Sequence, residues 1–213
     1  MRREPRLPPP PHLQGSPLGR VQALGIPRRY VDATLEGFSV GWPSMQENRS
    51  ALAVARDRAL AIASDQWLDV GLLTFYGAPG SGKDHLAWSI VKSLVYHHNA
   101  SALVVDWAHA MRAIRATWKV SAESEEAVLA RFTRPDVLVI RELSRHAFYG
   151  SPTQHLMDVI GRREEEEAFT IITTNSDVRA PEFAAMVGLA VADRILGGEV
   201  IYTGTESYRR SQR

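Results

Sequence analysis

A glycine-rich stretch, GAPGSGKD at residues 77–84, has the composition of a loop that binds phosphate groups. Gly77, Gly80 and Gly82 allow the backbone to turn tightly and to direct its N–H groups inward, and Lys83 adds a mobile positive charge. A helix that begins where the loop ends would contribute its positive N-terminus. The predicted nucleotide-binding residues are therefore Gly77, Ala78, Pro79, Gly80, Ser81, Gly82, Lys83 and Asp84. The alternative is an ordinary glycine-rich turn.

Asp84 departs from the usual form of such loops, in which Ser or Thr follows the lysine and its hydroxyl ligates Mg²⁺. An acid at the end of a later strand normally holds the water shell of the same ion. Here the matching strand is followed by Arg141 and then Glu142. We therefore predict a salt bridge between Asp84 and Arg141, with the guanidinium near the position that the ion would take. The alternatives are an acid that favours the first turn of a helix for Asp84 and a surface charge for Arg141.

Electrostatic energies favour this pair over two independent substitutions. An unpaired Asp84 would repel nucleotide phosphates by roughly 4 kcal/mol at a separation of about 4 Å and an effective dielectric constant of about 20. An unpaired Arg141 at the inner end of a strand would be a costly buried charge. Mg²⁺ normally neutralises charge in the transition state, so its replacement predicts slow hydrolysis. ATP or ADP can still bind through the loop amides and Lys83, whereas bound Mg²⁺ is doubtful.

The elements that must position these residues follow an alternating pattern of strands and helices. Short apolar runs without polar alternation are typical of strands in a parallel sheet that is covered on both faces. Helical patterns separate them, and the first run leads into the glycine-rich loop. We predict an α/β fold of the P-loop NTPase type, with a five-stranded, mostly parallel sheet whose strands lie near 70–77, 101–106, 136–140, 169–175 and 199–203.

Two further segments have clear patterns. Residues 44–66 are predicted to form a helix that is capped by Ser44, with Glu47 completing a capping box and with apolar residues at helical spacing. The charged run RREEEE at 162–167 is interpreted as a solvated helix end. Residues 1–25 are rich in Pro and Arg and are expected to form a flexible arm, so the folded domain is placed at 26–213.

The composition is that of an ordinary globular chain. Of the 213 residues, 45% are hydrophobic and 23% are charged, and the formal net charge is only +1. The absence of cysteine excludes disulfides and thiolate metal sites, and no apolar run reaches the roughly 18 residues of a membrane helix. We expect a cytoplasmic protein that does not associate with a membrane.

Several motifs in order resemble the AAA+ ATPases of the DnaC/IstB type, which act as helicase loaders and transposition helpers. Over about residues 24–213, the matching segments are LGIPRRYVDATLEGF (24–38), the loop, PDVLVIRELS (135–144), LMDVIGRREEEEAFTIITTN (156–175), LAVADRIL (189–196) and TESYRR (205–210). The resemblance implies that the Ile-Pro-x-x-Tyr segment at residues 26–30 lies beside the adenine. The sequence departs from the motifs of this family at Asp84 and Arg141.

The resemblance also implies roles for four residues in catalysis. Glu142 would polarise the attacking water, and Asn175 would act as the sensor of that water or the γ-phosphate. Arg194 would be the arginine finger that reaches a neighbouring subunit, and Arg209 would be the second sensor in its own subunit. Other interpretations stay open: Glu142 as a solvated strand-end acid, Asn175 as a turn cap, and Arg194 and Arg209 as partners in surface salt bridges.

Such proteins are expected to bind DNA, to form homo-oligomers and to recruit a replicative helicase or a transposase. Arg112, Arg115 and Lys119 share one helix face and could follow a phosphate backbone, with Trp118 near enough to stack on a base. A solvated face with a core tryptophan is the alternative. The competing function is a nucleotide-free pseudo-ATPase that serves as an interaction scaffold. A small-molecule kinase is disfavoured by the VADRIL and SYRR segments.

Overall fold

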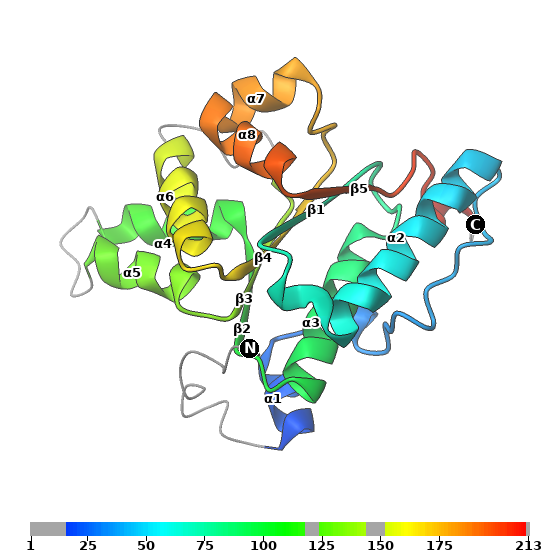
Figure 1. Cartoon of the computed structure of the whole chain (residues 1–213), viewed down its shortest axis with the longest axis horizontal. Coiled ribbons are helices and arrows are strands. Elements are labelled where there is room, and N and C mark those ends of the chain that lie inside the picture. Colours follow the sequence, from blue (N-terminus) through cyan, green and yellow to red (C-terminus); the bar gives the residue numbers. More distant parts are fainter. Residues whose placement is uncertain (1–15, 118–123, 144–151, 212–213) are drawn as a thin grey trace.

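The computed structural model describes residues 16–117, 124–143 and 152–211 (Figure 1). Its centre is a five-stranded sheet in the order β2-β3-β4-β1-β5, in which every pairing is parallel. The predicted α/β architecture is thereby confirmed. The strands are β1 (Leu72–Tyr76), β2 (Ala102–Asp106), β3 (Val137–Arg141), β4 (Phe169–Thr174) and β5 (Glu199–Tyr202).

Helices cover both faces of the sheet (Figure 1). On one face, α2 (Gln46–Ser64) and α3 (Lys83–His97) pack over a core that includes Val137 and Val139 of β3. On the other face, a second core includes the alternate residues Leu138 and Ile140. This alternation follows from the pleat of a strand, which directs successive side chains to opposite faces. The second core is covered by α4 (Trp107–Thr117), α5 (Glu125–Thr133), α6 (Pro152–Glu165), α7 (Pro181–Val187) and α8 (Leu189–Gly197).

The predicted helix at 44–66 is present, but its capping was predicted wrongly. Leu52 and Ile62 are fully buried, as the helical spacing indicates. The helix begins at Gln46, and Met45 in the cap position makes no side-chain capping bond. Ser44 instead donates through both its N–H and its hydroxyl to Glu206, which lies 162 residues away in the sequence. A carboxylate from a distant segment has replaced the local capping box.

Two other segments differ from the sequence-based expectation. Within the expected flexible arm, residues 1–15 lie outside the described residues, while Pro17–Ala23 form helix α1, which Ser16 caps and which contacts α3. The helical pattern at 180–196 is divided into α7 and α8 by Gly188, whose φ of 90° is not a helical conformation. Among the described residues, no helix combines the length and hydrophobicity that a membrane span requires.

Arg163 is a structural residue, although its sequence run was interpreted as a solvated helix end. Its side chain is only 1% exposed. Its guanidinium joins the end of α5 to the beginnings of β3 and β4 by donating to Thr170 Oγ1 and to the carbonyl oxygens of Phe132, Thr133, Pro135, Asp136 and Phe169. The interpretation as a solvated end was therefore wrong at this position.

Replacement of Arg163 by Met should destabilise the fold by about 3 kcal/mol, because several buried carbonyl groups lose their donor at once. The neighbouring Arg162→Met is the matched control, since Arg162 pairs with Glu126 at the surface and is largely exposed. It should leave stability almost unchanged. Urea denaturation of both variants measures the difference, and equal losses would contradict the structural role of Arg163.

Candidate nucleotide-binding site

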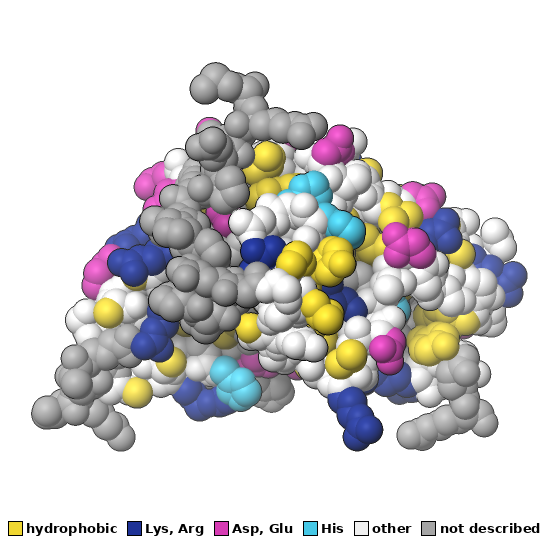
Figure 2. Space-filling view, turned by 90° about the horizontal axis from the view of Figure 1, so that it is seen from below, with side chains coloured by type: hydrophobic (Ala, Val, Ile, Leu, Met, Phe, Trp, Pro, Cys, Tyr) yellow, Lys and Arg dark blue, Asp and Glu magenta, His cyan; other side chains and the backbone are white. Residues whose placement is uncertain are grey.

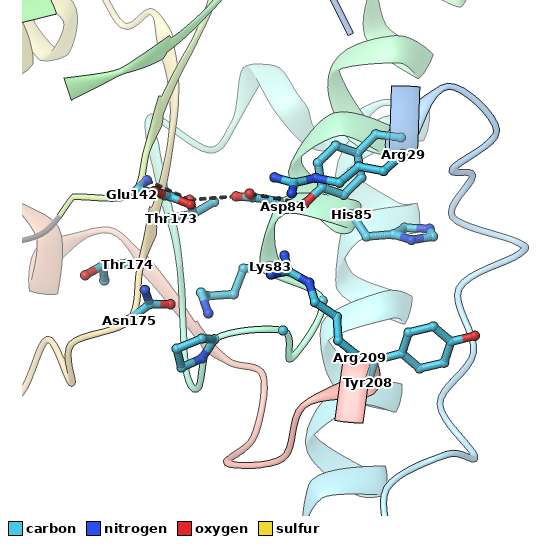
Figure 3. Close-up of a pocket in the computed structure, with 14 residues that line it drawn as sticks. Arg29, Lys83, Asp84, His85, Glu142, Thr173, Thr174, Asn175, Tyr208 and Arg209 are labelled. Atoms are coloured by element: carbon cyan, nitrogen blue, oxygen red, sulfur yellow. Dashed lines mark hydrogen bonds between the residues drawn. The ribbon is translucent and has the colours of Figure 1, made fainter. Parts of the chain in front are cut away.

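A cavity of about 290 Å³ lies at the carboxyl ends of the strands, above the loop between β1 and α3 (Figure 3). The structure brings eight of the predicted residues to its wall. Five of them have polar side chains: Lys83, Asp84, Glu142, Asn175 and Arg209. Pro79, Gly80 and Gly82 of the loop also line it. Parallel strands direct their carboxyl ends to one edge of the sheet, so the segments that follow β1, β3 and β4 converge there.

The loop has the backbone geometry that a phosphate cradle requires. Gly77 has a φ of 147° and Gly82 a φ of 105°, conformations that other L-residues rarely adopt. A Cβ on Gly77 would lie 2.7 Å from the carbonyl oxygen of Gly204, so the close approach of the C-terminal segment also demands glycine. Helix α3 begins at Lys83, directly after the loop, and its unpaired N–H groups and positive end face the same region.

Lys83 is held over the loop by the loop itself. Its ammonium donates to the carbonyl oxygens of Gly77 and Ala78 at 2.8 Å each. Burial lowers the pKa of Lys83 to about 8, although Asp84 and Glu142 act in the opposite direction. The side chain is therefore a cation near neutral pH that has already lost most of its hydration, which suits it to an anionic ligand.

The predicted salt bridge between Asp84 and Arg141 is confirmed. Arg141 Nη2 lies 2.7 Å from Asp84 Oδ2, and both side chains are about 85% buried, with exposed fractions of 15% for Arg141 and 14% for Asp84. Two hydroxyl groups complete the environment of the carboxylate: Thr173 Oγ1 donates to Oδ1 at 3.0 Å, and the Tyr30 hydroxyl donates to Oδ2 at 3.3 Å. The network joins α3, β3, β4 and the short 3₁₀ helix η2 (Arg28–Tyr30).

The titration of the pair follows from these contacts. Burial alone would raise the pKa of Asp84, but the hydrogen bond and charge of Arg141, with the two hydroxyl donors, bring that pKa below its usual value. Burial alone would lower the pKa of Arg141, and the bond to Asp84 outweighs it. Both groups are therefore charged over the physiological pH range.

The two members of the pair differ in their exposure to the cavity. Asp84 lines the cavity, but Arg141 does not. The guanidinium lies behind the carboxylate, with its central carbon 5.9 Å from the centre of the Trp88 ring on α3. The group that faces a bound nucleotide is therefore the acid, and the base neutralises it from the side of the core.

These residues do not fit a magnesium site of the usual kind. Both oxygens of Asp84 already accept hydrogen bonds from protein donors, and a cationic group stands where the second acid would hold the ion's water shell. Among the described residues, no group of three or more His, Asp or Glu side chains is placed to hold a metal ion by itself.

Glu142, Asn175 and Arg209 take positions that agree with their predicted roles. Glu142 follows β3 with a φ of 53°, and its N–H donates to Thr173 Oγ1. Asn175 follows β4, and Arg209 extends from α9 (Tyr208–Ser211) toward Lys83 (Figure 3). All three line the same cavity. Their roles in catalysis stay predictions, because geometry shows only that they can reach a common ligand.

Arg194 lies elsewhere in the subunit. It is on α8, where its Nε is 2.8 Å from Glu164 Oε2 of α6, and it does not line the cavity. The surface salt bridge that was the alternative interpretation is thus present within the subunit. A role as an arginine finger concerns a neighbouring subunit and stays a prediction.

The proposed DNA-binding face is described only in part. Arg112 is exposed on α4 and Arg115 is half-buried, while Trp118 and Lys119 lie outside the described residues. On the face shown in Figure 2, Lys and Arg side chains are dispersed among acidic and hydrophobic ones. A basic track on α4 therefore stays a prediction.

Sequence reasoning missed two contacts of Asp84, the one with Thr173 and the one with the hydroxyl of Tyr30. Thr173 lies two residues before Asn175, in the TTN segment of which only the asparagine was assigned a role. A hydroxyl side chain at the end of a strand beside Arg141 was the available signal, since parallel neighbours bring their ends together. Tyr30 also lines the cavity, and its hydroxyl is directed at Asp84.

The family model of the IstB-like ATP binding protein matches residues 55–213. The chain belongs to this family. The replicative helicase loader DnaC of Escherichia coli K12 is 29% identical over 143 residues, which cover 66% of the chain and 57% of the loader. An insertion-sequence ATP-binding protein of Sinorhizobium fredii is 27% identical over 185 residues, which cover 83% of the chain and 57% of that protein. The matches thus span a little over half the length of these relatives.

Solved structures confirm the predicted AAA+ P-loop fold. A crystal structure of the DnaC helicase loader superposes with a TM-score of 0.67 and 22% identity, covering 83% of the chain and 99% of the loader chain. AMPPCP-bound DnaA from Aquifex aeolicus superposes with a TM-score of 0.62 and 16% identity, covering 81% of the chain and 50% of that chain.

Replacement of Arg141 by Met should destabilise the protein by about 3 kcal/mol at pH 7, because it leaves the Asp84 carboxylate buried without its cation. The double variant Asp84→Asn with Arg141→Met should be more stable than the two single losses added together predict. Denaturant titrations complete this cycle. The Arg56→Met variant, at an exposed ion pair with Asp57, is the control and should change stability little.

The pH dependence gives a second check on the same variants. The pKa of Asp84 is depressed in the folded wild-type protein, so its stabilising effect is present above the unfolded value of about 4 and is lost as the pH falls through the folded value. In Arg141→Met, burial should raise that pKa instead. The stability difference between the two proteins should therefore shrink as the pH falls, first from the raised pKa of the variant to about 4 and then through the depressed pKa of the wild type. A difference that does not change with pH would contradict the pairing.

Proposed function

We propose that the chain is an ATP-binding accessory protein of DNA replication or transposition, in which hydrolysis is weak or absent. The observation that carries this proposal is the ion pair of Asp84 with Arg141 at the position where a hydroxyl and an acid would hold Mg²⁺. Membership of an ATP-binding family and the geometry of the loop support nucleotide binding.

Binding and hydrolysis depend on different groups in this cavity. The loop amides, the beginning of α3, Lys83 and Arg209 are the groups that would hold a polyphosphate. Glu142 and Asn175 are placed to orient a water molecule, but fast phosphoryl transfer also needs a cation that neutralises the developing charge. Arg141 forms an ion pair with Asp84 and does not line the cavity. The site therefore retains Lys83 and Arg209 for binding phosphates, and in this proposal it lacks the Mg²⁺ that would bridge the β- and γ-phosphates.

The partners follow from the relatives. One curated relative is a replicative helicase loader and another is an ATP-binding protein of an insertion sequence. We infer that the chain acts on DNA together with a replicative helicase or a transposase. We also infer that it does so as a homo-oligomer in the cytoplasm, with Arg194 released from Glu164 to reach a neighbouring nucleotide. A nucleotide-free interaction scaffold is the competing function.

Calorimetry of ATP binding tests the loss of the metal requirement. The wild-type chain should bind ATP in EDTA at least as tightly as in Mg²⁺. Restoration of the usual residues by Asp84→Thr with Arg141→Asp should make Mg²⁺ strengthen binding by about tenfold or more, because the metal again bridges protein and phosphates. The control is Asp57→Thr with Arg56→Asp, which makes the same two substitutions at an exposed pair.

The outcomes of that experiment separate the alternatives. Tighter wild-type binding in Mg²⁺, or rapid Mg²⁺-dependent release of radiolabelled phosphate, would contradict the loss of the metal requirement. If neither ATP nor ADP binds under either condition, the scaffold becomes the better description. The control variant should behave as the wild type does.

The lowered pKa of Lys83 predicts how nucleotide affinity depends on pH. Below about pH 8 the side chain is charged, and above that value the free protein must take up a proton to bind a polyphosphate. Affinity for ATP should be flat from pH 7 to 8 and should then fall, approaching a tenfold loss per pH unit, roughly as expected when one proton is taken up. Lys83→Arg keeps its charge and should remove this slope. A flat wild-type profile to pH 9.5 would contradict the lowered pKa of Lys83 in the free protein.

A further inference from the structure

The segment at residues 203–208 (TGTESY), which joins β5 to α9, lies between the phosphate loop and the beginning of α2. We call it the clamped segment. Figure 1 shows the red segment that follows β5 beside the first turns of α2. Tyr208, the last residue of this segment, and Arg209, the residue after it, both line the cavity. Their position therefore depends on what holds this segment.

On one side, the clamped segment is bonded to the phosphate loop. The carbonyl oxygen of Gly204 accepts from the N–H of Ala78 at 2.9 Å, and the N–H of Tyr208 donates to the carbonyl oxygen of Gly80 at 3.0 Å. The hydroxyls of Thr203 and Ser81 lie 2.6 Å apart in a buried contact. The segment and the loop thus share three hydrogen bonds over six residues.

On the other side, Glu206 joins the segment to α2. Its Oε2 accepts from the N–H and the hydroxyl of Ser44 at 2.9 and 2.7 Å. Its Oε1 accepts from the N–H of Met45 at 2.9 Å and from Nδ2 of Asn48 at 2.8 Å. Asn48 returns a contact through Oδ1, which accepts from the N–H of Thr205. These donors bring the pKa of Glu206 to about 2, so the carboxylate is ionised at any pH of interest.

We propose that Glu206 is a positioning residue, which anchors the clamped segment to the N-terminus of α2 and thereby holds Arg209 against the phosphate loop. The proposal rests on the proposed nucleotide-binding function. Helix α9 has only four residues, and so short a helix is not stable in water by itself. Its placement must come from contacts outside it. A carboxylate suits this role, because it accepts several hydrogen bonds at once and favours the positive end of a helix.

A second acid of the same region supplies a matched control. Glu199 of β5 also binds α2, through two bonds of 2.6 and 2.8 Å to the guanidinium of Arg58. This contact lies at the opposite end of β5 from the clamped segment and outside the cavity wall. Loss of Glu199 therefore removes a charged contact between α2 and the C-terminal part of the chain without touching the anchor of Arg209.

ATP affinity, measured by calorimetry in EDTA, tests the proposal. Arg209→Ala should weaken binding by about tenfold, as expected for the loss of a charged hydrogen bond to phosphate. Glu206→Ala should weaken it by a similar factor, and the double variant should be no weaker than Arg209→Ala alone, because Glu206 acts through Arg209. Glu206→Gln, which keeps the shape of the side chain, should lie in between. Glu199→Ala should bind as the wild type does.

Two results would contradict the positioning role of Glu206. If Glu206→Ala binds ATP no more weakly than Glu199→Ala, Glu206 is a structural contact only. If the losses of Glu206→Ala and Arg209→Ala multiply in the double variant, the two residues act independently. Either result overturns the proposal.

Hydrogen exchange provides a readout that needs no nucleotide. Glu206→Ala should speed exchange at the amides of Ala78 and Tyr208, which bond the segment to the loop, whereas Glu199→Ala should not. If the wild-type chain binds no ATP or ADP, the proposed function fails, and this comparison alone decides whether Glu206 holds the segment on the loop. Unchanged exchange in Glu206→Ala would overturn the anchoring role.

Discussion

The ion pair of Asp84 with Arg141 is the interaction on which the chemistry of this site depends. A buried pair stabilises a protein only when its remaining hydrogen-bonding capacity is satisfied, because each charge loses its hydration. Here Thr173 and Tyr30 supply donors to the carboxylate, and Trp88 lies beside the guanidinium. The pair is thereby held in one geometry, and it fixes the beginning of α3 relative to the ends of β3 and β4. Removal of either charge alone leaves the other buried and uncompensated.

The remainder of the site is arranged around the same edge of the sheet by contacts of a different kind. Glycines at positive φ shape the loop, and Lys83 bonds to the loop's own carbonyl groups. The clamped segment lies against this loop and is joined to α2 by Glu206. The loop is therefore supported from below by the strand and helix that it connects, and from the side by the C-terminal segment. Such support reduces the cost of ordering the site when a ligand binds.

Much of the fold and the central pair could be predicted from the sequence, because they follow from local patterns. The apolar runs indicated the strands, and the glycine-rich loop fixed the position of Asp84 relative to a strand and a helix. The position of Arg141 at the end of a later strand then placed the two charges at one edge of the sheet. Their opposite signs in swapped positions were sufficient to predict the contact, although they did not indicate that the guanidinium lies behind the carboxylate.

What could not be predicted depends on contacts between distant parts of the chain. Ser44 and Glu47 have the sequence of a local capping box, yet the hydroxyl of Ser44 donates to Glu206 instead. Arg163 sits in a charged run, yet only the packing of α5 against β3 and β4 reveals that carbonyl groups surround it. Local propensity cannot indicate such preferences, because the competing partners lie many residues away.

The exchanged charges of Asp84 and Arg141 also bear on how the site could act without rapid hydrolysis of ATP. A nucleotide that binds through loop amides and Lys83 would contact the loop residues that bond to the clamped segment. Its binding free energy would then act on Gly80 and Ala78, and through them on Tyr208 and Arg209, whether or not a phosphate is transferred. Hydrolysis would reset such a coupling, but the coupling itself needs only a difference in affinity between two conformations. The pair of Asp84 with Arg141 leaves the phosphate loop intact, which is what the proposed function requires of a protein that uses nucleotide as a ligand and hydrolyses it slowly.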